Sequence, residues 1–354
     1  MNLPRAAAWP AGLVIGAAAG WLCSRIGIPI PWMLGPLFSL ALLRVADVGV
    51  AAPPGGRQAG QWIIGTSLGL YFTPHVVREV AGWWPLLAVG AAFAIALGYA
   101  GGLVLARLAG IDRTTAIFAC VPGGAAEMAV LGHRFGARVD RVAAAQSLRI
   151  LIVVAIVPAA YALLGLHGAD RYVPGMTAFD ARGFVLLMAA TAAGGFLGQR
   201  LRVPNAFVLG SLAVAIPLTA AEINLSALPT LVSNAGQCLL GCALGARFQP
   251  DFLRGAPRYV SAVAVTVLGA IAVSAGFGVL LALLCGLNPA TLVLGTAPGG
   301  IAEMCITAKG LQLGVPLVTA FHVVRVVVLL LVTAPLFARV RGLRREPLKS
   351  GDRL

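Results

Sequence analysis

Two acidic and two basic side chains stand inside strongly apolar stretches of this sequence, and both types recur at one spacing. Glu127 and Glu303 lie 176 residues apart, as do Arg149 and Arg325. Ionisable groups within a membrane are costly, and they mark proton or ion pathways, bound substrates or buried ion pairs. The pattern predicts carboxylates that carry protons or balance charge. The arginines either pair with those carboxylates or bind an anionic solute.

Each glutamate follows a motif that interrupts a helix. The motif residues are Pro122, Gly123 and Gly124 in the first copy and Pro298, Gly299 and Gly300 in the second. Proline removes a backbone donor and glycine loosens a helix, so each motif predicts two half-helices that meet near the middle of the membrane. Neither apolar flank is long enough to span a membrane, which takes about 20 residues, whereas both flanks together are. The alternative is a surface loop in which the glutamates cap helix starts.

Further polar side chains accompany the motifs. Gln146 and His322 lie three residues before the two arginines and extend the polar face of the same helix. His322 has two alternative roles, a hydrogen-bonded structural residue or a proton relay. Gln61 and Gln237 begin a repeated pattern whose glycines allow close helix packing. These glutamines either bond across to neighbouring helices or line the site.

The composition is that of a membrane protein. Of 354 residues, 59% are hydrophobic and 11% are charged, against roughly 25% charged in a soluble domain. Several apolar runs predict an all-α polytopic membrane protein with about 10–12 transmembrane helices. We expect it in the bacterial plasma (inner) membrane, with membrane lipids as partners.

The chain divides into two homologous halves, with matched landmarks 175 or 176 residues apart. We expect membrane repeat 1 at 1–166, a polar connector at 167–182, membrane repeat 2 at 183–338 and a basic tail at 339–354. Six crossings per half would make the halves parallel, and five would invert them. The arginines around the first motif fall on both sides of the membrane under either count. The number of crossings therefore stays open.

The net charge of +14 is partly concentrated at the end of the chain, where basic residues from Arg339 to Lys349 follow an apolar run. Such a cluster predicts a cytoplasmic C-terminus in contact with anionic lipid head groups. Nucleic-acid binding is not expected, because no soluble domain is left to carry a groove-reading element. The first apolar segment lacks a small-residue cleavage site, so we interpret it as a span and not as a signal peptide.

The duplicated blocks Gly-Gln-x-x-x-Gly-x-x-x-Gly-x-x-Phe-x-Pro and Pro-Gly-Gly-x-Ala-Glu-Met resemble the bacterial AbrB membrane family over nearly the whole chain. Members are often labelled ammonia monooxygenase or regulator of gene expression. More distantly, Ala297-Pro298-Gly299-Gly300 is similar to the APGG of bile-acid/sodium symporters, and Arg25-Ile26-Gly27-Ile28-Pro29 to cation/proton antiporters. These resemblances imply inverted repeats with crossed, broken helices. Because glutamates replace the Ser-Asn of the symporters, protons are favoured over sodium.

The sequence favours a secondary transporter of a small solute, coupled to protons, with its site at the two symmetry-related breaks. A small organic anion or amino-acid-like solute suits half-helix N-termini together with arginine. The alternatives are a membrane-bound regulator or sensor that influences gene expression indirectly, and an integral-membrane oxidoreductase. Four scattered histidines and no nucleophile or nucleotide motif predict no enzyme activity, catalytic residue, metal site or cofactor. The oligomeric state is open, and a homo-oligomer is compatible with the sequence.

Overall fold

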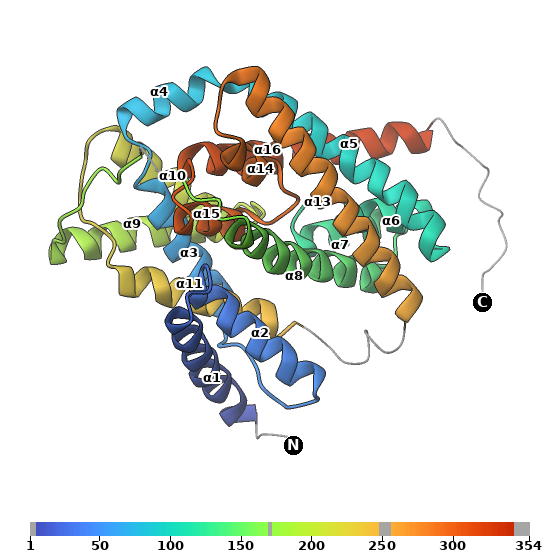
Figure 1. Cartoon of the computed structure of the whole chain (residues 1–354), viewed down its shortest axis with the longest axis horizontal. Coiled ribbons are helices and arrows are strands. Elements are labelled where there is room, and N and C mark those ends of the chain that lie inside the picture. The colour runs from blue at the N-terminus through green and yellow to red at the C-terminus, as the bar shows by residue number, and fades with distance from the viewer. Residues whose placement is uncertain (1–4, 169–171, 248–255, 343–354) are drawn as a thin grey trace.

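The computed structural model describes residues 5–168, 172–247 and 256–342, and every regular element in this part of the chain is a helix (Figure 1). The predicted all-α fold class is therefore confirmed. Five of the described helices are long and apolar enough to cross a membrane, namely α1 (Arg5–Arg25), α5 (Trp84–Ala109), α8 (Val139–Leu163), α9 (Ala181–Arg200) and α13 (Pro257–Cys285). The basic tail after residue 342 lies outside the described residues.

The two halves place their helices in the same order. The first half also contains α2 (Pro31–Val45), α3 (Gly56–Gly69), α4 (Pro74–Gly82), α6 (Arg113–Cys120) and α7 (Ala125–Arg134). The second half also contains α10 (Ala206–Ala220), α11 (Thr230–Gly245), α14 (Pro289–Thr296), α15 (Ile301–Gly310) and α16 (Val315–Gly342). Left-handed backbone positions recur as well, because Ile30 and Asn205 precede α2 and α10 at φ 45° and 47°. The two halves therefore match in backbone conformation at this position.

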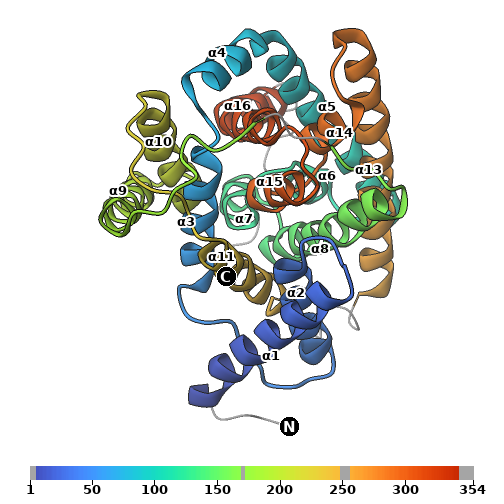
Figure 2. The ribbon, with the colours of Figure 1, turned by 60° about the vertical axis from the view of Figure 1, so that its left-hand side comes forward.

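The helices form two bundles that pack against each other (Figures 1 and 2). We call α1, α2, α3, α9, α10 and α11 the six-helix bundle, and α5 to α8 with α13 to α16 the hairpin bundle. Glycines bring the six-helix bundle together. A Cβ on Gly65 of α3 would lie 2.7 Å from the Val208 carbonyl oxygen, and one on Gly241 of α11 would lie 2.4 Å from that of Met33. These glycines therefore hold helices of one half against helices of the other.

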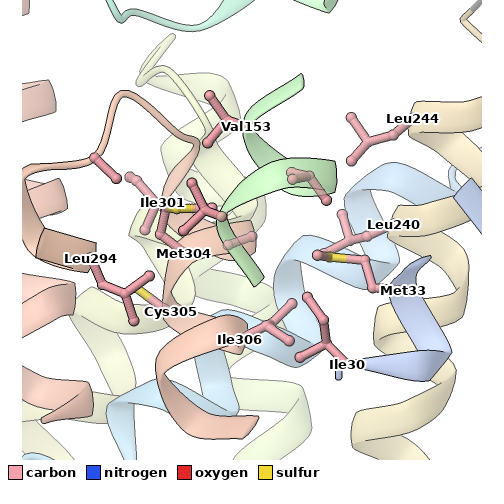
Figure 3. Packing of buried hydrophobic residues seen from close by; sticks show 14 of the residues in the cluster. Ile30, Met33, Val153, Leu240, Leu244, Leu294, Ile301, Met304, Cys305 and Ile306 are labelled. Atoms are coloured by element: carbon pink, nitrogen blue, oxygen red, sulfur yellow. The ribbon is translucent and has the colours of Figure 1, made fainter. Parts of the chain in front are cut away.

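The two bundles meet mainly through apolar side chains. Figure 3 shows Ile30, Met33 and Leu240 of the six-helix bundle facing Ile301 and Ile306 of α15. All five residues are buried members of one cluster that crosses the boundary. Helices approach one another closely across this boundary chiefly where α15 and α16 pass α3. The bundles are therefore joined mainly by apolar side-chain contacts and less by close packing of helix backbones.

Within the hairpin bundle, the equivalent helices α5 and α13 run antiparallel. Arg258, near the start of α13, donates from Nε to the Leu108 carbonyl oxygen near the end of α5 at 3.2 Å. Phe93 of early α5 stacks on Phe277 of late α13, with ring centroids 3.8 Å apart. Equivalent helices of the two halves thus point in opposite directions at this place.

The chain turns back on itself at the first Pro-Gly-Gly motif, between α6 and α7. Just beyond α7, the backbone N–H of Arg138 donates to Thr115 Oγ1 in the first turn of α6, at 2.9 Å. The rings of Phe118 and Phe135 stack with centroids 5.8 Å apart. The end of α7 therefore lies beside the start of α6, and the two helices form a hairpin with the motif at its tip.

The second motif is also the tip of a hairpin, formed by α14 and α15. A Cβ on Gly314, just before α16, would lie 2.8 Å from Thr291 Cγ2 in the first turn of α14. The expectation that both flanks of a motif form one interrupted span is therefore wrong. The physical reason is that α8 and α16 return alongside α6 and α14 and bind the tip carbonyls, as described below.

Labelling from the two sides of the membrane tests the first hairpin. In a protein whose six cysteines are replaced by alanine, Arg113→Cys and Arg134→Cys place exposed thiols at the start of α6 and the end of α7. We expect a membrane-impermeant maleimide to label both from one side. Val173→Cys should be labelled from the opposite side, because α8 runs between them. Labelling of the first two thiols from opposite sides would mean that the motif lies in a continuous span.

Candidate functional site

Arg149 and Arg325 hold the two hairpin tips through backbone carbonyl groups. Arg149 on α8 donates from Nη1 to the Val121 oxygen at 3.2 Å and from Nη2 to the Gly123 oxygen at 3.4 Å. Arg325 on α16 makes the two equivalent bonds at the second tip, at 2.7 and 2.5 Å. A proline and two glycines leave tip carbonyls without helical partners, and buried carbonyls need donors. Each planar guanidinium supplies two donors at once.

The expected ion pairs of Arg149 and Arg325 with Glu127 and Glu303 are absent from the described residues. No described carboxylate oxygen lies within 4.0 Å of either guanidinium. Instead, Nη1 and Nη2 of each guanidinium donate to the tip carbonyl oxygens. Both arginines are 4% exposed, and the Nε of each is buried without a hydrogen-bond partner in the described chain. Two positive charges are thus buried without a contacting counter-charge.

Gln146 and His322 strengthen the same tips one turn away from the arginines. Gln146 Nε2 donates to the carbonyl oxygens of Phe118 and Val121, at 2.9 and 2.8 Å. His322 Nε2 donates to the Leu294 carbonyl oxygen at 3.0 Å, while its Nδ1 is buried without a partner among the described residues. Both side chains are fully buried. Their contacts fit the structural role, and neither lines the cavity described below.

The two glutamates lie in the first turns of α7 and α15, folded back over the preceding glycine. A Cβ on Gly124 would be 1.9 Å from Glu127 Oε2, and one on Gly300 would be 2.0 Å from Glu303 Oε2. Glycine therefore leaves room for this side-chain position. Glu127 Oε1 accepts from the Asn205 backbone N–H at 3.4 Å, whereas its Oε2 has no partner in the described chain. Both carboxylates lie at helix N-termini, where negative charge is stabilised.

Asn205 distinguishes the two halves at a matched backbone position. Its Oδ1 accepts from Gln61 Nε2 at 3.3 Å and from Arg57 Nη2 at 3.4 Å, and this joins α3 to the start of α10. The equivalent residue of the first half is Ile30, which is buried and packs against the end of α15. Gln237 therefore lacks the polar partner that Gln61 has. It is half-buried and makes no side-chain hydrogen bond to a described residue.

A cavity of about 50 Å³ lies between the hairpin tips and the six-helix bundle. It has room for a few water molecules, since each takes about 10–15 Å³ on this measure. The charged residues of its lining are Arg57, Arg149, Arg247, Arg325 and Glu303. Four guanidiniums against Glu303 in the lining, with Glu127 in contact with Asn205 beside it, leave a net positive charge, which favours an anion over a cation.

A second cavity, of about 30 Å³, lies between α5, α13 and the tips. It shares Pro122, Arg149 and Arg325 with the first cavity, so the two spaces are adjacent. Most of its remaining lining is apolar, with small residues such as Ala94, Gly98 and Gly101 on α5. The two buried arginines therefore border a polar space and an apolar one.

The structure gathers most of the predicted site residues at the polar cavity. The lining includes Gln61, Pro122, Gly123, Gly124, Arg149, Gly299, Gly300, Glu303 and Arg325. Outside the lining are Glu127, Gln146, Gln237, Pro298 and His322. Among the described residues, no three histidine, cysteine, aspartate or glutamate side chains gather as a metal site requires.

Sequence reasoning missed Arg57, Asn205 and Arg247, which all line the polar cavity. Alignment of the two halves contains a signal for Asn205, because this polar residue replaces Ile30 at a matched position. Arg57 and Arg247 lie outside any polar motif, one at the start of α3 and the other just beyond α11. Only the packing of these helices beside the hairpin tips brings both arginines to the cavity.

Comparison with known proteins identifies the family. The family model AbrB, described as "Transition state regulatory protein AbrB", matches residues 32–341, which is most of the chain. The "Uncharacterized protein YhjN" of Bacillus subtilis (strain 168) is 28% identical, over 94% of this chain and 93% of its own. The "Putative regulator AbrB" of Escherichia coli (strain K12) is 23% identical, over 89% of this chain and 90% of its own. The protein therefore belongs to the AbrB family.

Proposed function

We propose that this protein is a secondary transporter of a small solute, with its substrate site at the tips of the two helical hairpins. The observation that carries the proposal is the meeting of both tips at a buried cavity that contains Arg149, Arg325 and Glu303. Interrupted helices around an internal cavity present polar backbone groups to a solute without exposing them to lipid. A positively charged cavity suits a small anion.

The proposed transport cycle is a movement of the hairpin bundle against the six-helix bundle. Their largely apolar interface supports this, because sliding there breaks few hydrogen bonds. On one side of the tips the cavity contains Arg57, Asn205 and Arg247, whereas Ile30 and Ile306 pack together on the matched side. The antiparallel arrangement of α5 and α13 supports inverted halves. Inverted halves supply a second state, in which the polar cavity lies on the side that is now closed by apolar packing.

We place the protein in a bacterial inner membrane with its C-terminus on the cytoplasmic side. Six arginines lie at the end of the hairpin bundle where α6 begins, namely Arg107, Arg113, Arg134, Arg138, Arg141 and Arg258. The loops at the opposite end, residues 164–168, 286–288 and 311–314, contain no lysine or arginine, and α4, which leads into the start of α5 there, adds only Arg78. Positively charged loops favour the cytoplasmic side. α16 runs toward the arginine-rich end, and this supports a cytoplasmic C-terminus.

Uptake into proteoliposomes tests the transporter, and the two glutamates test its coupling. Glu127 and Glu303 are proposed to carry protons or to balance the arginine charges. We expect the purified protein to accumulate at least one member of a panel of organic anions and amino acids under an imposed proton gradient. The Glu127→Gln, Glu303→Gln double variant should lower that uptake by roughly tenfold or more, since neutral amides neither titrate nor carry charge.

Glu222→Gln provides the matched control, because Glu222 is an exposed carboxylate beyond α10 and should be replaceable without effect. Unchanged uptake by a folded double variant would contradict the roles given to the two glutamates. Absence of uptake for every solute in the panel, with the protein folded, would contradict the transporter itself.

A further inference from the structure

We infer that the transported solute is a short-chain monocarboxylate. Its carboxylate would lie between Arg149 and Arg325, and its hydrocarbon end would enter the apolar cavity between α5 and α13. The assignment rests on the proposed transport function and names the substrate class for the same site. Three features support it: the unused donors of the two guanidiniums, the charge of the polar cavity, and the adjacent apolar space.

The guanidiniums have free donors and no contacting counter-ion. Each guanidinium has five N–H groups, and Arg149 and Arg325 each use two N–H donors on tip carbonyls. The Nε of each is buried without a partner among the described residues. A buried cation without a counter-charge is costly, and a guanidinium matches a carboxylate in plane and spacing. An anion bound between the two arginines removes that cost.

The charge of the polar cavity limits the ligand to an anion. Arg57 and Arg247 add two further positive charges to its wall, and Glu303 supplies the single carboxylate of the lining. Cations and zwitterions would each bring a positive group to this cluster of arginines. A simple carboxylate brings none.

The apolar cavity limits the size and polarity of the part of the ligand beyond its carboxylate. It borders the same two arginines, and Leu97, Val263 and Val267 contribute to its wall. Its volume of about 30 Å³ corresponds to about two or three water-sized groups, hence to two or three carbon atoms. Sulfate or phosphate would leave this space unfilled, and a dicarboxylate would bury a second charge in it. Propionate and butyrate therefore fit best.

Two glycine variants test the apolar subsite without touching the arginines. Gly101 lines the cavity, and a Cβ there would have its nearest neighbour at 3.5 Å, so a side chain can enter the space. Gly269 on α13 has no atom within 4 Å of its Cβ position and does not line the cavity. Gly101→Leu should fill the subsite, and Gly269→Leu is the matched control.

The measurements are calorimetric binding of acetate, propionate, butyrate, hexanoate, succinate and sulfate to the purified protein, and uptake of radiolabelled butyrate into proteoliposomes. We expect propionate and butyrate to bind most tightly. Gly101→Leu should weaken butyrate binding by about tenfold relative to acetate, since the excluded carbons lose their apolar contacts. Gly269→Leu should leave the order of affinities unchanged.

Two results would overturn the assignment: succinate or sulfate binding as tightly as butyrate, or an unchanged chain-length preference in Gly101→Leu. Uptake of another solute by a protein that binds no monocarboxylate would refute the substrate class and leave the transporter intact. Tight butyrate binding without uptake of butyrate or any other solute would refute the transporter while supporting the binding site.

Discussion

Arg325→Ala is expected to unfold the tip of the second hairpin and to abolish transport. The substitution removes the donors for the Ala297 and Gly299 carbonyl oxygens, both of which belong to buried residues. Each unsatisfied buried acceptor costs about 1–3 kcal/mol, so the loss of folding free energy is about 2–6 kcal/mol. Thermal unfolding of the purified protein in detergent measures that loss.

Arg325→Lys separates charge from hydrogen-bond geometry. A lysine keeps the positive charge but lacks the planar fork, so one carbonyl is expected to stay unsatisfied and the loss should be intermediate. Arg78→Ala is the control, since Arg78 is exposed on α4 and bonds only within its own helix turn. Surface changes of that kind alter stability by about 0.5 kcal/mol or less. A wild-type melting temperature for Arg325→Ala would mean that the tip does not depend on the guanidinium.

Gly278→Ala is expected to push the second hairpin away from α13. The new Cβ would lie 2.7 Å from Val293 Cα and 2.8 Å from Val293 N on α14. Both are backbone atoms, so no side-chain rotation relieves the clash, and overpacking of this kind costs about 1–3 kcal/mol. Displacement of α14 also moves its tip carbonyls relative to Arg325. We therefore expect a lower melting temperature together with reduced solute uptake.

Gly276→Ala is a matched control two residues away on the same helix. No atom lies within 4 Å of its Cβ position, so the added methyl group meets open space. Removal of a glycine from a helix interior stabilises it by roughly 0.5–1 kcal/mol, and this variant should melt at the wild-type temperature or above. Equal melting temperatures for the Gly278 and Gly276 variants would show that close packing of α13 on α14 does not support the hairpin.

Much of the site could be predicted from its sequence, because the 176-residue repeat singles out the motif glycines, the glutamates and the arginines. The partners of Arg149 and Arg325 could not be predicted. Two buried carboxylates and two buried arginines suggest ion pairs by charge alone, but a Pro-Gly-Gly tip also creates unsatisfied carbonyls. In the structure those carbonyls accept the guanidinium donors, although each glutamate is nearer to its arginine along the chain.

The direction of the chain after each motif could not be predicted from the sequence either. α6 and α7 have 8 and 10 residues, lengths that suit two halves of a span as well as two arms of a hairpin. Read as one span, they place Arg113 and Arg134 on opposite sides of the membrane. Read as a hairpin, they place both on the arginine-rich end. The hydrogen bond from Arg138 to Thr115, made between segments 23 residues apart, distinguishes these alternatives.

Ile30 and Asn205 show how far the two halves have diverged since the chain was duplicated. A left-handed conformation costs an ordinary L-residue about 1–2 kcal/mol, and asparagine tolerates it far better than a β-branched residue. A symmetric dimer of two first halves would have the apolar packing of Ile30 at both faces and no Asn205 to bond Gln61. A dimer of two second halves would have Asn205 at both faces and would lack the apolar packing that Ile30 makes. A dimer of either half alone would therefore lack the difference between the two sides that the single chain has at this position.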